Sequence, residues 1–135
     1  MFPQAQRSQL LVVEAGDELV VYDQARHRAH RLNATAAMVW RHCNGETSVA
    51  DLARLLEKEF GLSGDEDLIW LALNRLKTAH LLHGPLDRRA TDSVSRRRVV
   101  RKLALTTTLT FLLPVVTSLI APTPLMSQSL CCNCW

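Results

Sequence analysis

Hydrophobic and polar residues alternate over the first third of the chain in a pattern that is typical of β-strands. Residues 9–14 (QLLVVE) and 18–23 (ELVVYD) flank residues 15–17 (AGD), a short connection with a glycine that can adopt a positive φ, and so predict a β-hairpin. Residues 27–32 (HRAHRL) alternate less clearly, but the segment is short and precedes a helix cap, which favours a third strand. A three-stranded antiparallel sheet is therefore expected, and the polar residues 1–8 before it are expected to be frayed.

The pattern then changes to the 3.6-residue period of amphipathic helices. Asn33 can accept hydrogen bonds from the first free N–H groups of a helix, while Gly45 and Gly61 are suited to the left-handed position that ends one. Acidic residues at 65–67 favour the start of a third helix, which is apolar on almost every side and needs a second partner surface besides the core. The expected helices span residues 34–43, 47 or 48 to 60, and 68–82.

Charge divides the chain into two unlike parts. All 13 acidic residues precede Ser93, whereas residues 96–102 hold a basic block, RRRVVRK, and residues 103–135 hold no charged side chain. Residues 103–121 approach the length of a membrane span, but Pro114 and several threonines weaken that interpretation. The expected segments are a folded domain at 8–84, a polar and basic linker at 85–102, an uncharged leader-like or membrane-like segment at 103–126, and a Cys-rich end at 127–135.

Cysteine positions exclude a disulfide framework for the folded domain, because only Cys43 lies within it and the other three cysteines are among the last five residues. The first residues hold neither a charged n-region nor an apolar run, so no N-terminal secretory signal is expected. We therefore expect the domain to mature in the cytoplasm.

The order of these elements closely resembles the PqqD-like family. The resemblance covers about residues 10–83. It is carried by the hydrophobic strand 19–22 after a polar turn, the cap Leu32-Asn33-Ala34-Thr35-Ala36, the Val39-Trp40 pair, Gly45, and the helix 48–60.

Members of this family are α+β, winged-helix-like domains known as RiPP recognition elements, which bind leader peptides of ribosomally made, post-translationally modified peptides and deliver them to tailoring enzymes. The resemblance implies binding rather than catalysis, with the leader adding as a strand to the third β-strand and entering the cleft beside the third helix. The implied edge is His27, Arg28, Ala29, His30, Arg31 and Leu32, and the implied cleft wall is Leu68, Leu71, Ala72 and Arg75.

The tail departs from the family pattern, and two interpretations remain open. In the first, the chain is a precursor fused to its own recognition element. Residues 94–100 could then supply the added strand in cis or in trans, and a tailoring enzyme would modify Cys131, Cys132, Cys134 and Trp135. In the second, residues 95–101, which resemble a twin-arginine motif, and residues 103–121 anchor or export the protein. The three tail cysteines would then form a redox or metal-binding end, although they are too few for a four-ligand zinc site.

No catalytic role is expected for this chain. Its histidines have no Ser, Cys or carboxylate partner at a diagnostic spacing, so we expect neither an enzyme nor a cofactor for the chain itself. Nucleic acid is not an expected partner, because the third helix begins with acidic residues and residues 1–92 are slightly acidic overall. The expected partners are a tailoring enzyme and the leader segment, with membrane association or later export left open.

Overall fold

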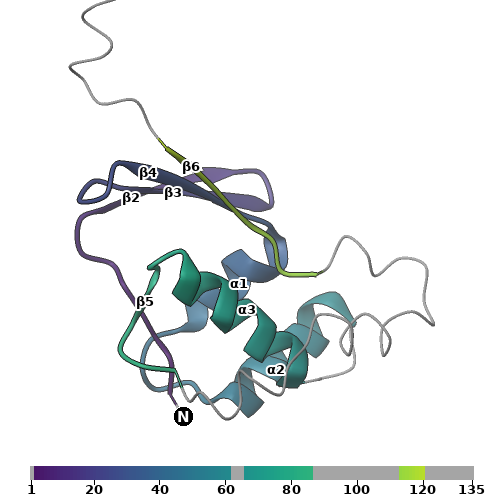
Figure 1. The fold of residues 1–135 in the computed structure, drawn as a ribbon. Coiled ribbons are helices and arrows are strands. Elements are labelled where there is room, and N and C mark those ends of the chain that lie inside the picture. The colour runs from purple at the N-terminus through teal and green to yellow at the C-terminus, as the bar shows by residue number, and fades with distance from the viewer. Residues whose placement is uncertain (1, 62–65, 87–112, 121–135) are drawn as a thin grey trace, which may run out of the picture.

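The computed structural model describes residues 2–61, 66–86 and 113–120 (Figure 1). A four-stranded antiparallel sheet forms one layer, in the order β2-β3-β4-β6, and a separate two-stranded sheet joins β1 to β5. The strands are β1 (Gln4–Ala5), β2 (Leu10–Ala15), β3 (Glu18–Asp23), β4 (Arg28–Leu32), β5 (Leu82–His83) and β6 (Val116–Ile120).

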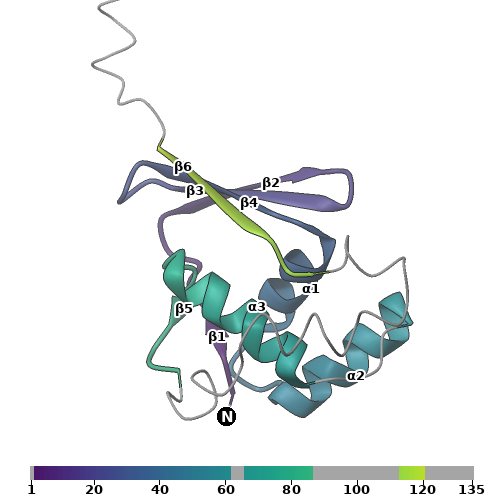
Figure 2. The same ribbon diagram turned by 45° about the vertical axis from the view of Figure 1, so that its right-hand side comes forward.

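Three helices lie together on one face of the four-stranded sheet (Figures 1 and 2). They are α1 (Ala34–His42), α2 (Val49–Phe60) and α3 (Glu66–Thr78). Asn33 caps α1 and Ser48 caps α2, each through a side-chain oxygen that accepts a backbone N–H of the first turn. Gly61 ends α2 at a φ of 64°, where a residue with a Cβ would be strained.

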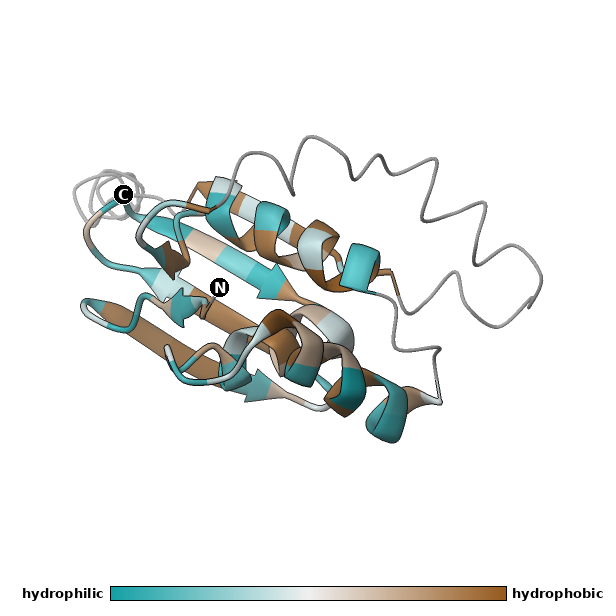
Figure 3. Ribbon diagram, turned by 90° about the horizontal axis from the view of Figure 1, so that it is seen from below, coloured by the Kyte–Doolittle hydropathy of each residue, from teal (hydrophilic) through white to brown (hydrophobic). Residues whose placement is uncertain are grey.

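The hydrophobic core lies between the sheet and the helices. In β3, Leu19 and Val21 point inward and are fully buried, and β3 packs against α1 within the core. Hydrophobic and hydrophilic positions occupy different sides of α2 and α3 (Figure 3). Trp40 is buried in α1, and its indole Nε1–H donates to the carbonyl oxygen of Leu81 at 3.1 Å, so the one polar atom of this large side chain is satisfied within the core.

The α+β, winged-helix-like fold class is confirmed, although the main sheet has four strands rather than three. The expected fraying of residues 1–8 is wrong for β1, because Gln4–Ala5 pairs with Leu82–His83 and Ala5 is buried. The third helix ends at Thr78 rather than at Leu82. His80 adopts a φ of 60° just after the helix, which breaks the helical path before β5.

The fourth strand of the sheet comes from the tail. Val116–Ile120 pairs antiparallel with β4 at the sheet edge, so the end of the segment expected to be leader-like or membrane-like is a β-strand on the domain. Residues 87–112 and 121–135 lie outside the described residues. Within the described ranges, no helix combines the length and hydrophobicity that a membrane span requires.

Candidate functional site

The candidate site begins with a tight turn that positions β4. Asp23, which is almost fully buried, accepts hydrogen bonds from the backbone N–H groups of Ala25 and Arg26 at 3.0 and 3.1 Å and pairs with the Arg26 guanidinium. Burial raises the pKa of the Asp23 carboxyl, but the hydrogen bonds from Arg26 and Ala25 outweigh it and hold that pKa below its usual value. Asp23 thus remains charged and fixes the chain as it enters β4.

His27 does not belong to the edge strand, contrary to the sequence prediction. The strand begins at Arg28, while His27 lies in the preceding turn with a φ of 51°. Its Nδ1 lies 3.3 Å from the hydroxyl of Tyr22. Arg28, Ala29, His30, Arg31 and Leu32 do form the predicted strand.

The chain's own tail occupies the predicted edge. β6 pairs with β4 over five residue pairs, from Arg28 opposite Ile120 to Leu32 opposite Val116. In this register, Val116 and Ser118 lie on the helix side of the sheet, because their partners in β4, Leu32 and His30, are buried. The sheet edge therefore holds an added strand, supplied in cis by a segment far along the sequence.

Asn33 clamps the start of this added strand. Its Nδ2 donates to the carbonyl oxygen of Leu113 at 2.6 Å, and its Oδ1 accepts the N–H of Val115 at 3.0 Å. The same Oδ1 accepts the N–H of Ala36 at 3.1 Å, and the backbone N–H of Asn33 donates to the carbonyl of Val115 at 3.2 Å. One residue therefore both caps α1 and holds the chain around Pro114.

A partly buried polar contact joins the middle of the two strands. His30 is only 1% exposed, and its Nδ1 lies 2.8 Å from the hydroxyl oxygen of Ser118. Its Nε2 has no hydrogen-bond partner among the described residues. The contact is thus the one polar interaction described for a ring that is otherwise surrounded by the core.

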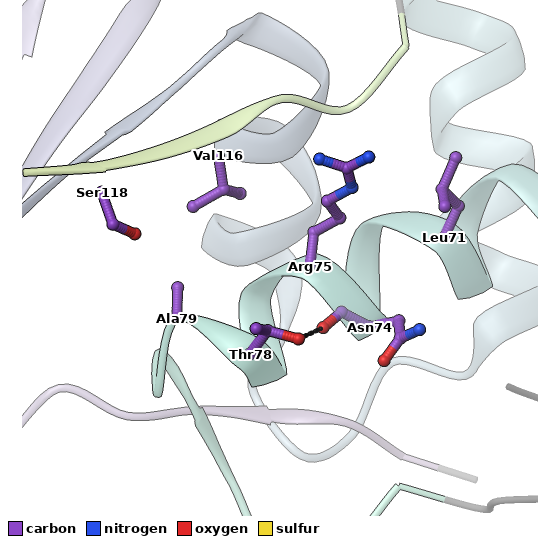
Figure 4. Close-up of a pocket in the computed structure, with 7 residues that line it drawn as sticks. All are labelled: Leu71, Asn74, Arg75, Thr78, Ala79, Val116 and Ser118. Atoms are coloured by element: carbon purple, nitrogen blue, oxygen red, sulfur yellow. Dashed lines mark hydrogen bonds between the residues drawn. The ribbon is translucent and has the colours of Figure 1, made fainter. Parts of the chain in front are cut away.

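A pocket of about 280 Å³ opens between α3 and β6. Figure 4 shows Val116 and Ser118 pointing from β6 towards α3, with Leu71 and Arg75 on the facing helix. Of the predicted cleft wall, Leu71 and Arg75 line this pocket, whereas Leu68 and Ala72 are fully buried in the core. The described lining residues are Leu71, Asn74, Arg75, Thr78, Ala79, Val116 and Ser118.

Sequence reasoning missed the contributions of β6 and of the last turn of α3. The segment VVTSLI at 115–120 is β-branched and apolar and lies between Pro114 and Pro122, a pattern typical of a strand. Asn33 was predicted as a cap, but its bonds to Leu113 and Val115 depend on a segment about 80 residues away.

The tail residues predicted for modification lie outside the described residues. They are Cys131, Cys132, Cys134 and Trp135. The strand predicted at 94–100 and the twin-arginine-like motif at 95–101 also lie outside the described residues. Within the described part, no cluster of three metal-ligating side chains occurs. Cys43 is buried beside Trp40, and burial raises the pKa of its thiol to about 12, which keeps it protonated and unreactive.

The buried His30 predicts a loss of stability in mild acid. Burial lowers the pKa of His30 below 6.5, with Asp23 opposing and Arg28, His80 and Arg26 adding to the effect. The unfolded chain takes up a proton near pH 6.5 while the folded chain does not, so the free energy of unfolding should fall by up to about 1.4 kcal/mol per pH unit until the folded pKa is reached.

Urea unfolding between pH 7.5 and 5 measures this effect. A His30→Gln variant is the control, and it should show a shallower loss over the same range, since its amide does not titrate. Equal slopes for the two proteins would contradict the assignment to His30.

The fold and this edge define a class of small α+β domain that accepts an extended segment by strand addition. The family model described as coenzyme PQQ synthesis protein D (PqqD) matches residues 18–82, which include β3, β4, α1, α2 and α3. Just under half of the chain thus matches the PqqD family, which supports a PqqD-like RiPP recognition element over these residues. Comparison with curated proteins and with solved structures gives no significant match.

Proposed function

We propose that this chain is a RiPP precursor fused to its own recognition element, which docks its leader in cis and presents the Cys-rich end to a tailoring enzyme. The pairing of β6 with β4 supports this most directly. A segment of the uncharged tail lies on the strand that the family resemblance implies for leader binding, with the pocket of α3 beneath it. PqqD domains typically bind a tailoring enzyme, which supplies the partner that the proposal needs.

Strand addition suits a leader because its backbone contacts and its side-chain contacts have different roles. Backbone hydrogen bonds between β4 and β6 supply affinity for any extended chain, while the inward side chains Val116 and Ser118 supply selectivity at the pocket. The docked state of residues 116–120 supports a leader role rather than a membrane anchor for this part of the tail.

The direction of β6 favours presentation of the C-terminal residues. The chain leaves the edge after Ile120, and Cys131 follows eleven residues later. Such a segment spans at most about 40 Å when fully extended. An enzyme bound beside the domain would therefore receive the modifiable residues within a limited radius, without any catalytic group or cofactor from this chain.

The thiol chemistry of the chain would also restrict modification to the tail. Cys43 is buried and its raised pKa disfavours the thiolate, the form that acts as a nucleophile and metal ligand. Cys131, Cys132 and Cys134 are the remaining thiols, and Trp135 adds an aromatic ring that can be cross-linked. We propose that this modification takes place in the cytoplasm.

Intact-mass spectrometry after co-expression with tailoring enzymes encoded beside this chain tests the proposal. We expect a mass change with one of them, and fragmentation should confine it to residues 127–135 and leave Cys43 unmodified. An unchanged mass with every such enzyme would overturn the precursor assignment. A change on Cys43 alone would overturn it as well.

A further inference from the structure

His30 and Asn33 lie at two separate points along the docked strand, and each accepts only certain partners. This inference rests on the proposed function: we propose that these two residues determine the register in which the docked strand pairs with β4. We call this pair of contacts the register lock: the hydroxyl of Ser118 lies beside His30, and the N–H of Val115 donates to Asn33.

A shift of β6 by two residues in either direction removes the partner of His30. It would place Val116 or Ile120 opposite the imidazole in place of Ser118. Neither side chain can hydrogen-bond, so both ring nitrogens would be buried without a partner, since Nε2 has none among the described residues already. Leaving a buried polar group unsatisfied is disfavoured whichever tautomer the ring adopts.

A shift by one residue fails for a different reason in each direction. In one direction Leu119 comes to lie opposite His30, again without a hydrogen-bonding group. In the other direction Thr117 supplies a hydroxyl to His30, but Pro114 then takes the place of Val115 opposite Asn33. Proline has no N–H to donate to Asn33 Oδ1.

Each of the four neighbouring registers therefore loses at least one hydrogen bond to His30 or Asn33, and neither residue alone disfavours all four. Backbone pairing by itself would be indifferent to such shifts, because every register offers N–H and C=O groups. A unique register fixes how many residues separate the sheet edge from Cys131. This makes His30 and Asn33 the specificity-determining residues for the docked segment.

The test compares Ser118→Thr and Ser118→Val in the full chain, because threonine and valine have the same shape. Threonine keeps the hydroxyl for His30 and valine replaces it with a methyl group. Amide hydrogen exchange by NMR at Thr117 and Leu119 should accelerate about tenfold or more in Ser118→Val and stay within about threefold of the wild type in Ser118→Thr. The NOE between the α-protons of His30 and Ser118, which report this pair directly, should persist only with Thr.

A double-mutant cycle separates a specific contact from general damage to the strand. His30→Leu removes the buried imidazole, and the exposed hydroxyl of Ser118 can then bond to water. Adding Ser118→Val to the His30→Leu chain should therefore change exchange by less than about threefold, although the same substitution accelerates exchange in the wild-type chain. Equal exchange in the Ser118→Thr and Ser118→Val chains, or additive effects in the double variant, would overturn the register lock. Neither readout needs a tailoring enzyme, so this outcome is independent of whether the tail is modified.

Discussion

Replacing Thr117 with proline should release β6 from β4 and lower modification of the C-terminal residues at least tenfold. In antiparallel ladders, residues whose backbone groups bond across the strands alternate with residues whose groups point away. The N–H of Asn33 donates to the carbonyl of Val115, so the next pairs of the bonded kind are Arg31–Thr117 and Ala29–Leu119. Proline at 117 removes a donor from the middle of the ladder.

Ile120→Pro is the matched control for Thr117→Pro. Ile120 ends β6, is 80% exposed, and has an N–H that the same alternation directs away from β4. We expect amide protection across β6 to fall more than 30-fold in Thr117→Pro and less than threefold in Ile120→Pro. Circular dichroism should show a folded domain in both variants, because nearly all of the buried core precedes residue 83. Unchanged modification in a Thr117→Pro chain that has lost β6 protection would show that docking does not serve presentation.

Asn33→Ala should have the second large effect, because one substitution removes a helix cap and the clamp on the tail. Loss of the cap costs about 1 kcal/mol, and each of the two side-chain bonds to Leu113 and Val115 contributes roughly 0.5–1.5 kcal/mol. Urea unfolding should therefore show a loss of about 2–4 kcal/mol. Hydrogen exchange should show that the amides of β6 lose protection before the rest of the sheet.

Two variants separate the roles of Asn33. Ser48→Ala removes the cap of α2, which packs against α1 and α3, and should cost about 1 kcal/mol while leaving β6 protected. Asn33→Asp keeps the oxygen that accepts from Ala36 and Val115 but loses the donor to Leu113. The free energy of unfolding of Asn33→Asp and its β6 protection should lie between those of the wild type and of Asn33→Ala. Equal loss of β6 protection in Ser48→Ala and Asn33→Ala would assign the effect to helix stability instead of the clamp.

Local signals were sufficient to predict most of the domain from its sequence. The hairpin around Gly16, the cap at Asn33 and the end of α2 at Gly61 each depend on residues a few positions apart, and all three are present. From the resemblance to the PqqD family we could also predict that β4 is the pairing edge. Of the four residues predicted for the cleft wall, Leu71 and Arg75 line the pocket.

Contacts between distant segments could not be predicted in the same way. β1 is two residues long and has no periodicity of its own, so its pairing with Leu82–His83 and its bridge to Asn44 define it. The apolar run after α3 continues the helical pattern although the backbone turns at His80. The sequence of residues 116–120 is compatible both with a strand and with part of a membrane-like segment. Only the pairing with β4, which is distant in the sequence, identifies it as a strand.

The covalent connection between β4 and β6 changes what affinity the edge requires. A tethered segment meets its site at an effective concentration that reaches the millimolar range, whereas a free peptide meets it at its concentration in solution. Even a strand that binds in the millimolar range would be substantially docked when it belongs to the same chain. A separate peptide with the sequence of residues 113–120 should therefore displace β6 only at comparable concentrations, so pairing within one chain does not require tight binding.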